Sequence, residues 1–356
     1  MKLLILSRYD RLGASSRLRT MQYLPWLEAA GINAQIEPFF DDFYLQRLYA
    51  GRRSGIAVAG YYLRRATRLL QAERPDAIWL EKELLPWLPA GIEQLLLPSG
   101  VPMVSDYDDA VFHRYNLHPL RVVRGLLGRK IDRVMARSAL VLAGNPYLAG
   151  HARTVGAREV EIVPTVVDVH AYDTAPICDG KGSLRVGWIG TPGTWKQYML
   201  PMRSMLTDLA ARNGAVLRTV GAGNQAEGQG IESLSWSEES ESRMIQGMDI
   251  GLMPLDDTPW SRGKCGYKII QYMACGLPVV ASPVGVNAEI VEHGVTGFLA
   301  TSETEWREAL TTLLRDRELR RRMGAAGRRK IEAQYSLQVW GPRVAALLAA
   351  VVHNSH

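Results

Sequence analysis

Short apolar runs alternate along the whole chain with longer segments of helical spacing. The segments between the runs place apolar residues three and four positions apart, which is typical of amphipathic helices. The runs are rich in Val, Ile, Leu and Ala and predict buried strands over 2–7, 33–39, 76–80, 101–105, 139–143, 159–163, 184–189, 215–220, 249–254 and 279–281. This alternation predicts an α/β chain of parallel sheets with helices on both faces.

The alternation of strands and helices falls into two parts. The piece A-P-I-C-D-G-K-G-S over 175–183 is polar and carries glycine, which is typical of a linker. We therefore predict a first domain over 1–172, a second over 183–335 and a last amphipathic helix over 336–356. A chain of 356 residues is long enough for two such domains.

The stretch from Lys264 to Gly285 combines a loop, a helix and a strand. Its helix ends at Gly276, where a C-cap favours a left-handed residue. Lys264 and Lys268 flank Gly266 at the start of the helix, where unpaired N–H groups and the positive end of the dipole favour an anion. Two lysines favour a phosphate over a carboxylate. The alternative is an ordinary surface helix with solvated lysines.

Two further strands run into glycine loops. The strand over 184–189 leads to G-T-P-G-T-W-K, in which Gly190 allows a ligand close to the backbone and Thr194 is the expected helix cap. Lys196 then falls in the first turn, an unfavourable position for a cation unless an anion lies there. The strand over 215–220 leads in the same way to Gly221.

The first strand is also followed by a small-residue loop and a helix. Gly13 lies in that loop, and Ser15 and Ser16 are the expected helix caps. Arg17 follows them in the helix. A strand, a small-residue loop and a helix form the anion-facing crevice of a doubly wound sheet, although Arg17 is equally well explained as a solvated helix residue.

These motifs resemble glycosyltransferase family 4, a family of retaining enzymes with the GT-B fold. The residues that carry the resemblance are Gly266, Tyr272-Met273-Ala274, Gly276, Pro278 and Val279-Val280. The resemblance implies two Rossmann-like domains with parallel sheets facing a central cleft, and a last helix that crosses back to the first domain. The family usually has two glutamates with seven residues between them, and Gly263 and Gln271 stand at those positions here.

The resemblance also implies the reaction. A sugar would pass from a nucleotide diphosphate sugar, of UDP or GDP type, to a hydroxyl acceptor with its anomeric configuration retained. No cofactor and no catalytic metal would be needed. Cations and helix dipoles would stabilise the leaving diphosphate, and we expect Lys264 to take part in catalysis. The residues expected to bind the donor are Gly13, Gly190, Thr191, Lys196, Gly221, Gly266, Lys268 and Gln271.

The segment S-D-Y-D-D-A-V-F-H-R follows the fourth predicted strand. Its Asp106-x-Asp108 resembles the aspartate motif with which GT-A glycosyltransferases hold a divalent metal. Because the chain has the two-domain order of the GT-B class, we instead interpret the aspartates as sugar or acceptor contacts. Asp108 and His113 are catalytic candidates, and Arg17 and Asp109 are expected on the acceptor side. The alternative for His113 is a surface histidine.

The charge of the chain is basic and unevenly distributed. The net charge is +6, and basic residues, Arg65 and Lys130 among them, concentrate in 47–74 and 121–137 between apolar residues at helical spacing. Basic amphipathic helices of this kind suit an anionic membrane surface, although two ordinary helices covering a sheet would give the same pattern. No recognised motif supports binding to nucleic acid.

Several sequence features bear on localisation. Cys178, Cys265 and Cys275 fit neither a disulfide framework nor a metal site, which favours a reducing compartment. The opening M-K-L-L-I-L-S is too short for a signal peptide, and no apolar run approaches a membrane span. We expect a cytoplasmic protein, peripheral at the inner face of a membrane.

The expected role is transfer to a saccharide or lipid-linked acceptor in the assembly of a surface polysaccharide or glycolipid. Two rivals stand beside it. A sugar-nucleotide epimerase or phosphorylase of the same fold would give product without an acceptor. A non-catalytic partner of another transferase would bind a nucleotide sugar and turn nothing over.

Overall fold

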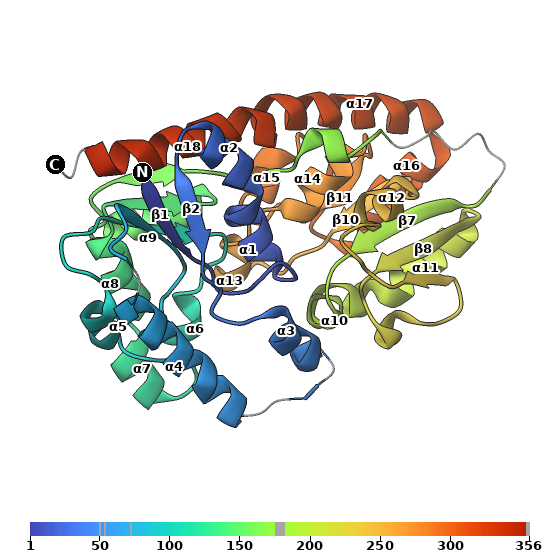
Figure 1. Cartoon of the computed structure of the whole chain (residues 1–356). Coiled ribbons are helices and arrows are strands. Elements are labelled where there is room, and N and C mark those ends of the chain that lie inside the picture. Colours follow the sequence, from blue (N-terminus) through green and yellow to red (C-terminus); the bar gives the residue numbers. More distant parts are fainter. Residues whose placement is uncertain (50, 53–54, 72, 175–181, 354–356) are drawn as a thin grey trace. The chain divides into compact units, whose positions relative to one another are not determined.

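The chain forms two compact α/β units. The computed structural model describes residues 1–49, 51–52, 55–71, 73–174 and 182–353 (Figure 1). The first unit comprises residues 1–165 and 340–356, and the second comprises 166–339. Most of the linker predicted over 175–183, including Cys178, lies outside the described residues.

The first unit contains a six-stranded parallel sheet. Its strands lie in the order β2-β1-β3-β4-β5-β6, and every neighbouring pair is parallel. The strands are β1 (Lys2–Leu6), β2 (Asn33–Ile36), β3 (Ala77–Glu81), β4 (Met103–Tyr107), β5 (Leu140–Ala143) and β6 (Val160–Ile162). In β1, β3, β4 and β5 nearly every residue is buried, as expected for a sheet covered on both faces.

Helices cover both faces of this sheet. Alternate residues of β1 and β3, together with Val134, form a core with α4 on one face. On the α2 side, the ring of Trp26 lies where a Cβ on Gly341 of α18 would be, so these helices pack closely. The helices are α1 (Ala14–Arg19), α2 (Leu24–Ala29), α3 (Asp42–Tyr49), α4 (Gly55–Gln71), α5 (Ala90–Leu96), α6 (His113–Asn116), α7 (Arg121–Leu127), α8 (Lys130–Arg137), α9 (Pro146–Thr154) and most of α18 (Leu337–His353).

The second unit repeats the plan. Its strands lie in the order β12-β11-β10-β7-β8-β9, again all parallel. The strands are β7 (Leu184–Ile189), β8 (Ala215–Val220), β9 (Ile231–Leu234), β10 (Ile250–Met253), β11 (Val279–Ala281) and β12 (Gly297–Leu299). The helices are α10 (Pro192–Thr194), a π-helical turn (Trp195–Met199), α11 (Arg203–Arg212), α12 (Glu241–Gln246), α13 (Pro259–Arg262), α14 (Tyr267–Ala274), α15 (Asn287–Ile290), α16 (Glu303–Arg315) and α17 (Arg317–Gln334).

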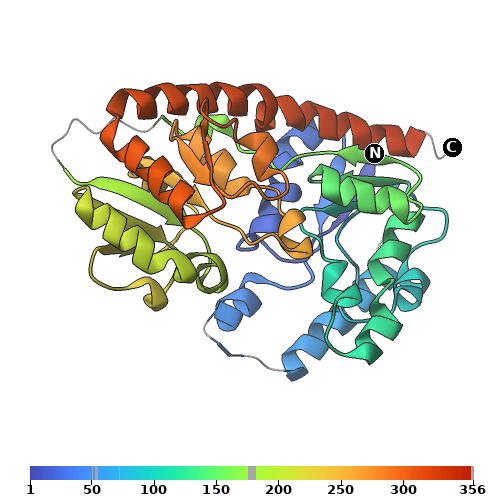
Figure 2. The same cartoon turned by 180° about the vertical axis from the view of Figure 1, so that it is seen from behind.

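Alternating residues of one strand fill the two cores of the second unit. Val280 packs with α11 and α16, whereas Val279 and Ala281 pack with α14 and Ile331 of α17. Figure 2 shows α11 and α16 on the face seen from behind. The sheet therefore lies between two helical layers, and both sheets have the parallel α/β arrangement that the alternation predicted.

Some strand predictions differ from the structure. β9 and β12 were not predicted, because these short edge strands are partly exposed and lack a continuous apolar run. The fourth strand begins and ends two residues later than predicted, so Asp106 lies inside β4 rather than in the loop after it. Periodicity locates a strand well but its ends poorly, since both ends are set by pairing with neighbours.

Two of the residues assigned to a basic surface are buried. Lys130 contacts Glu83 and Glu93, with both ion pairs inside the first unit. Arg65 donates to the backbone carbonyl of Ser7. The expectation that all these cations are at the surface is therefore wrong for two of them. Within the part of the chain that the structure describes, no helix is both long and apolar enough to cross a membrane.

Candidate functional site

The carboxyl edge of the second sheet brings two glycine loops together. β7 ends at Ile189 before Gly190, and β8 ends at Val220 before Gly221. A Cβ on Gly190 would lie 2.6 Å from the ring of Trp188, and one on Gly221 would lie 2.6 Å from the Gly190 carbonyl oxygen. Gly221 also has a left-handed backbone, with φ of +75°. Only glycine fits at these two positions, because protein atoms occupy the space of a Cβ.

The loop after β7 is capped differently from the prediction. Thr191, not Thr194, is the N-cap of α10, and the two threonine side chains form a reciprocal capping box. The short helix continues as the π-helical turn Trp195–Met199, in which Lys196 is exposed. Thr191, which was expected to bind the donor, thus has a local structural role.

Lys264 and Lys268 lie over two aromatic rings of this edge. The Lys264 Nζ is 5.8 Å from the ring centroid of Tyr198, and the Lys268 Nζ is 5.8 Å from that of Trp188. The same Trp188 ring packs against Gly190. Lys268 and the glycine loop after β7 are therefore neighbours, and cation–π contact holds both ammonium groups at the edge.

Gly266 begins α14 in a conformation that favours glycine. Its φ is +63°, and a Cβ there would lie 2.5 Å from the Ile290 Cδ1. As the N-cap it has no side-chain oxygen with which to cap α14. The helix start therefore has neither capping side chain nor acidic residue, which suits an anion. At the other end Gly276 is left-handed with φ of +72°, as predicted.

Gln271 is turned into the interior of the second unit. Its side-chain amide donates to the Tyr172 hydroxyl and to Glu241 Oε1, at 3.0 and 2.7 Å. The next residue, Tyr272, accepts a hydrogen bond from the Ile189 backbone N–H at 3.1 Å. Through this hydrogen bond α14 fixes the end of β7, where the Gly190 loop begins.

The first unit also gathers its predicted residues at the carboxyl edge of its sheet. Gly13 is the N-cap of α1, and a Cβ there would lie 2.3 Å from that of Tyr9. Ser15 and Ser16 are not caps as predicted: the buried Ser16 hydroxyl donates to Glu81 at 2.6 Å. Arg17 donates to the Arg11 carbonyl oxygen within the same loop.

Asp106 has a structural partner rather than a metal-like environment. Arg19 Nε and Nη2 donate to its two carboxylate oxygens at 2.8 and 3.1 Å, and both side chains are almost fully buried. A bidentate arginine occupies the oxygens that a metal would need. Among the described residues, no three His, Cys, Asp or Glu side chains are arranged to hold a metal ion.

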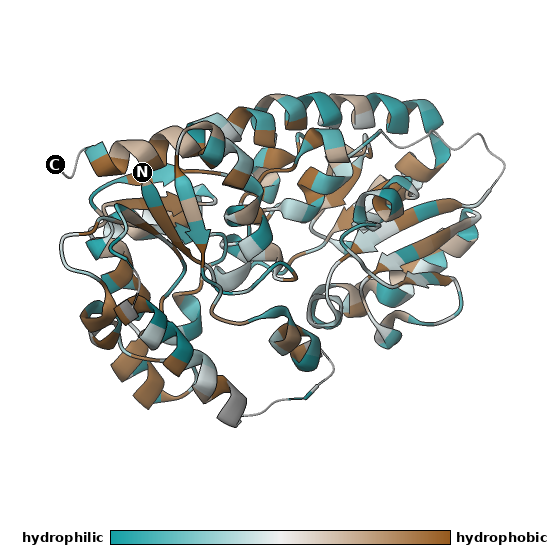
Figure 3. Ribbon diagram, viewed as in Figure 1, coloured by the Kyte–Doolittle hydropathy of each residue, from teal (hydrophilic) through white to brown (hydrophobic). Residues whose placement is uncertain are grey.

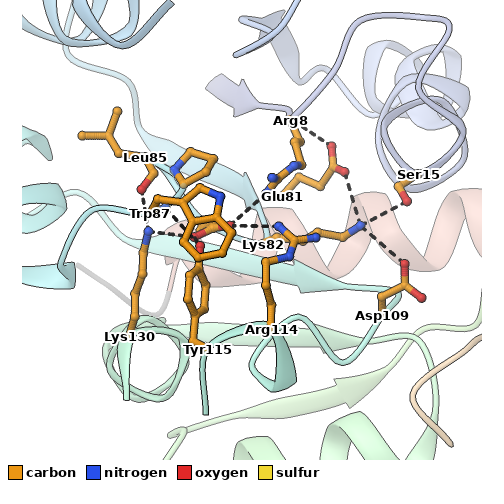
Figure 4. Close-up of polar contacts among 12 residues, drawn as sticks. Arg8, Ser15, Glu81, Lys82, Leu85, Trp87, Asp109, Arg114, Tyr115 and Lys130 are labelled. Atoms are coloured by element: carbon orange, nitrogen blue, oxygen red, sulfur yellow. Dashed lines mark hydrogen bonds and ion pairs between the residues drawn. The ribbon is translucent and has the colours of Figure 1, made fainter. Parts of the chain in front are cut away.

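Asp108 and Asp109 meet at Lys82, a residue that sequence reasoning missed. The Lys82 Nζ lies 2.8 Å from Asp108 Oδ1 and 3.9 Å from Asp109 Oδ2. Figure 4 shows the contact with Asp109. Burial would raise the pKa of the Asp108 carboxyl, but the Lys82 ammonium and the Ser15 hydroxyl outweigh burial and lower it. Asp108 is therefore an ionised carboxylate held in a buried setting.

A second buried cluster lies beside it around Glu83. Arg8 Nη1 contacts Glu83 Oε1 at 2.8 Å, and Lys130 Nζ contacts Glu83 Oε2 at 2.7 Å. The Tyr115 hydroxyl donates to the same carboxylate at 2.7 Å. Burial would raise the pKa of Glu83, but Lys130 and Arg8 lower it below its usual range.

His113 begins α6 and hydrogen-bonds within the first unit. Its Nε2 lies 2.7 Å from the Tyr147 hydroxyl, and its Nδ1 lies 3.0 Å from the side-chain Oδ1 of Asn116. Burial, with His151 nearby, lowers the pKa of its imidazole although Asn116 opposes the shift. His113 is thus a neutral ring near pH 7, and its hydrogen bonds do not join it to the Lys82 group.

The structure thus forms two groups from the predicted residues. Gly190, Gly221, Gly266, Lys264 and Lys268 gather at the edge of the second sheet, and Gly13, Asp108 and Asp109 at the edge of the first. The buried Lys82 could be suspected only from the run E-K-E after an apolar strand. No residue-type signal marks its left-handed backbone, which glycine or asparagine would usually occupy.

Comparison with known proteins agrees with this geometry. The family model described as "Glycosyl transferases group 1" matches residues 183–316, within the second unit. N-acetyl-alpha-D-glucosaminyl L-malate synthase from Bacillus anthracis is 35% identical over 72 residues, which cover 20% of this chain and 19% of that protein. The first two curated relatives are matched over only 19% and 26% of their own lengths.

Two solved structures resemble the whole chain. Sucrose-phosphate synthase from Thermosynechococcus elongatus matches with a TM-score of 0.73 and 13% identity, covering 99% of this chain and 100% of that one. HepE from Anabaena, solved in complex with UDP, matches with a TM-score of 0.72 and 18% identity over 98% and 100% of the two chains. Both likenesses concern the fold. Residues 183–316 therefore resemble the group 1 glycosyl transferases, and the chain has the GT-B type of fold.

Proposed function

We propose that this protein is a retaining, metal-independent glycosyltransferase. It moves a sugar from a nucleotide diphosphate sugar to a hydroxyl acceptor, with the donor held by the second unit. The observation that carries the proposal is the gathering of two glycine loops, two lysines and an uncapped helix start at the carboxyl edge of the second sheet. That edge is where doubly wound sheets bind their ligands.

The chemistry of this edge suits a leaving diphosphate. Gly190 and Gly221 have no side chain that would screen their backbone from phosphate oxygens. Lys264, Lys268 and the start of α14 supply positive charge where negative charge develops as the bond between sugar and phosphate breaks. Lys196, exposed in the turn after α10, is a further candidate for the same role. HepE, which has a similar fold, has been solved with UDP and with UDP-glucose, which favours a UDP-type donor.

Nucleotide binding tests the donor site. The melting temperature of the protein is measured with UDP, GDP, ADP and TDP, each with and without EDTA, and calorimetry gives the dissociation constant of the best ligand. A ligand that binds only the folded state at 100 times its dissociation constant stabilises it by about 2.7 kcal/mol. One stabilising diphosphate that EDTA does not affect supports the proposal, and a shift that EDTA removes contradicts metal independence.

Lysine variants test the residues. Lys268→Ala and Lys264→Ala each remove a charged partner worth roughly 1.5–3 kcal/mol, so the affinity for the diphosphate should fall at least tenfold. Lys330→Ala is the control, because Lys330 is a lysine of the same unit whose ammonium donates to the Glu289 carbonyl oxygen. Nucleotide binding without any turnover would instead favour a non-catalytic partner, and turnover of the sugar without an acceptor would favour an epimerase. The anomeric configuration of the product, read by NMR, tests retention.

We also propose that the first unit associates peripherally with an anionic membrane, where a lipid-linked acceptor would lie. In α7 only Leu127 is buried, while Val122 and Leu126 are 70% and 67% exposed beside Arg121 and Arg124 (Figure 3). Exposed apolar residues with neighbouring arginines suit such a surface.

Cosedimentation with vesicles tests the membrane proposal. The protein should bind vesicles that contain phosphatidylserine and not vesicles of phosphatidylcholine alone. Val122→Ser/Leu126→Ser should lose this binding while Val295→Ser, an exposed apolar position in the second unit, keeps it. Equal binding by all three proteins would contradict the role of α7.

A further inference from the structure

Lys82 has a backbone conformation that its residue type disfavours. It follows β3 with φ of +64°, in the left-handed region that L-residues other than glycine and asparagine seldom enter. Its side chain is only 8% exposed. Such strain persists only where surrounding contacts impose it, most often at functional sites. The contacts of the buried ammonium show what imposes it here.

The Lys82 ammonium joins four oxygen-bearing side chains. It lies 2.8 Å from Asp108 Oδ1, donates to Ser15 Oγ at 3.1 Å, and lies 3.9 Å from both Asp109 Oδ2 and Glu81 Oε1. Figure 4 shows the contacts with Ser15, Asp109 and Glu81. Burial alone would lower the pKa of Lys82, but the neighbouring carboxylates of Asp108, Asp109 and Glu81 outweigh it and raise that pKa. The ammonium is therefore a permanent cation near neutral pH.

These partners come from three neighbouring strands. Ser15 follows β1, Lys82 follows β3, and Asp108 and Asp109 follow β4, and these strands are adjacent in the order β1-β3-β4. Their carboxyl ends meet at one edge because the strands are parallel. Of the two aspartates, Asp109 is the more accessible, with 31% of its side chain exposed against 13% for Asp108. The Lys82 ammonium thus contacts all three loops of this edge, and the Asp109 carboxylate remains partly exposed.

We propose that Lys82 is a positioning residue for the acceptor, holding the Asp108 and Asp109 carboxylates and the loop around Ser15 so that Asp109 accepts a hydrogen bond from the acceptor hydroxyl. The inference rests on the proposed transferase function and adds a residue to its acceptor side. Lys82 itself touches no substrate. Its left-handed backbone turns the side chain back over the edge, so that a single buried charge fixes two anions that would otherwise repel each other.

A second buried lysine provides a matched control. Lys130 is fully buried and contacts Glu83 at 2.7 Å and Glu93 at 2.9 Å, two carboxylates that the acceptor proposal does not use. Its loss should destabilise the first unit without disturbing Asp109. Comparing Lys82→Met with Lys130→Met therefore separates a defect in the acceptor site from a general loss of stability.

The experiment measures release of UDP from UDP-glucose with water or octyl β-glucoside as the hydroxyl, and the dissociation constant of UDP by calorimetry. Lys82→Met should lose roughly 100-fold in release rate, as expected when a reacting group is misplaced by about 1 Å, and should keep the UDP affinity of the wild type. Lys130→Met should keep the release rate despite a lower melting temperature. Lys82→Gly, which relieves the backbone strain, should be as slow as Lys82→Met.

Chemical rescue tests the role of the charge itself. In Lys82→Ala, propylamine can enter the space of the missing side chain, and its ammonium should restore part of the release rate, whereas propanol should not. Full activity of Lys82→Met, a parallel loss of UDP affinity, or absence of rescue by propylamine would overturn the inference. A wild type that binds no nucleotide, or that binds UDP and turns nothing over, refutes the proposed function, whereas a wild type and a Lys82→Met variant that release UDP equally fast overturn the inference alone.

Discussion

The buried pair of Arg19 and Asp106 offers a quantitative test of the first unit. Both side chains are 1% exposed, and the guanidinium binds the carboxylate through Nε and Nη2 while Nη1 donates to the Val163 carbonyl oxygen at 2.7 Å. Arg19→Met leaves the Asp106 charge buried without its partner, which should cost about 3–5 kcal/mol in the free energy of unfolding. Asp106→Leu in turn leaves the Arg19 charge buried without its partner, and it should cost a similar amount.

The double variant separates the pair from its surroundings. Arg19→Met/Asp106→Leu removes both charges and fills similar volume, so its cost should fall to roughly 1–3 kcal/mol, chiefly from the unsatisfied Val163 carbonyl. Urea unfolding at pH 7 of the four proteins gives the coupling energy, which should be several kcal/mol. Additive single losses would refute the reasoning, because they would mean that the two groups do not depend on each other.

The pH dependence gives this prediction a second check. Burial raises the pKa of the Asp106 carboxyl, although Arg19 opposes the shift. Without Arg19 the pKa of Asp106 in the folded protein should rise further. The loss in free energy of unfolding caused by Arg19→Met is therefore present in full above that folded pKa, and it disappears as the pH falls below the unfolded pKa near 3.8. The destabilisation at pH 8 should therefore exceed that at pH 5. A cost independent of pH would show that lost packing, not the stranded charge, is responsible.

Three further predictions concern particular contacts. Gly324→Ala places a Cβ 1.8 Å from the Gly276 carbonyl oxygen, so it should lower the melting temperature of the second unit strongly, while Gly214→Ala, at a left-handed turn with open space, should cost about 1 kcal/mol. Tyr272→Phe strands the buried Ile189 N–H and should cost about 1–3 kcal/mol by urea unfolding; a neutral result would mean that this N–H finds another partner. Because the pKa of Glu83 is lowered in the folded protein, its carboxylate should stabilise the protein above pH 4.5 and lose that contribution as the pH falls through the folded pKa. When unfolding is measured from pH 6 to 3, Glu83→Gln should therefore lose less stability than the wild type.

The sequence alone determined most of the architecture. Strands over 184–189 and 215–220 coincide with β7 and β8, and Gly276 is left-handed at the end of its helix as predicted. Such features are local: an apolar run buried on both faces, a glycine after a helix and a small-residue loop after a strand act through the residues at hand. The resemblance carried by 264–285 was likewise local, and the group 1 match over 183–316 contains that stretch.

The tertiary structure decided the partners of buried charges. Asp106 was expected in a loop and instead lies in β4 against Arg19, which comes from a helix 87 residues earlier. Lys130 was expected at the surface and instead joins Glu83 and Glu93 in the interior. The sequence did not indicate a role for Lys82, although its ammonium contacts both predicted aspartates. A charge is stable inside a protein only with a partner, and here that partner comes from a distant segment. Sheet order and register, rather than spacing along the chain, therefore determine which charges meet.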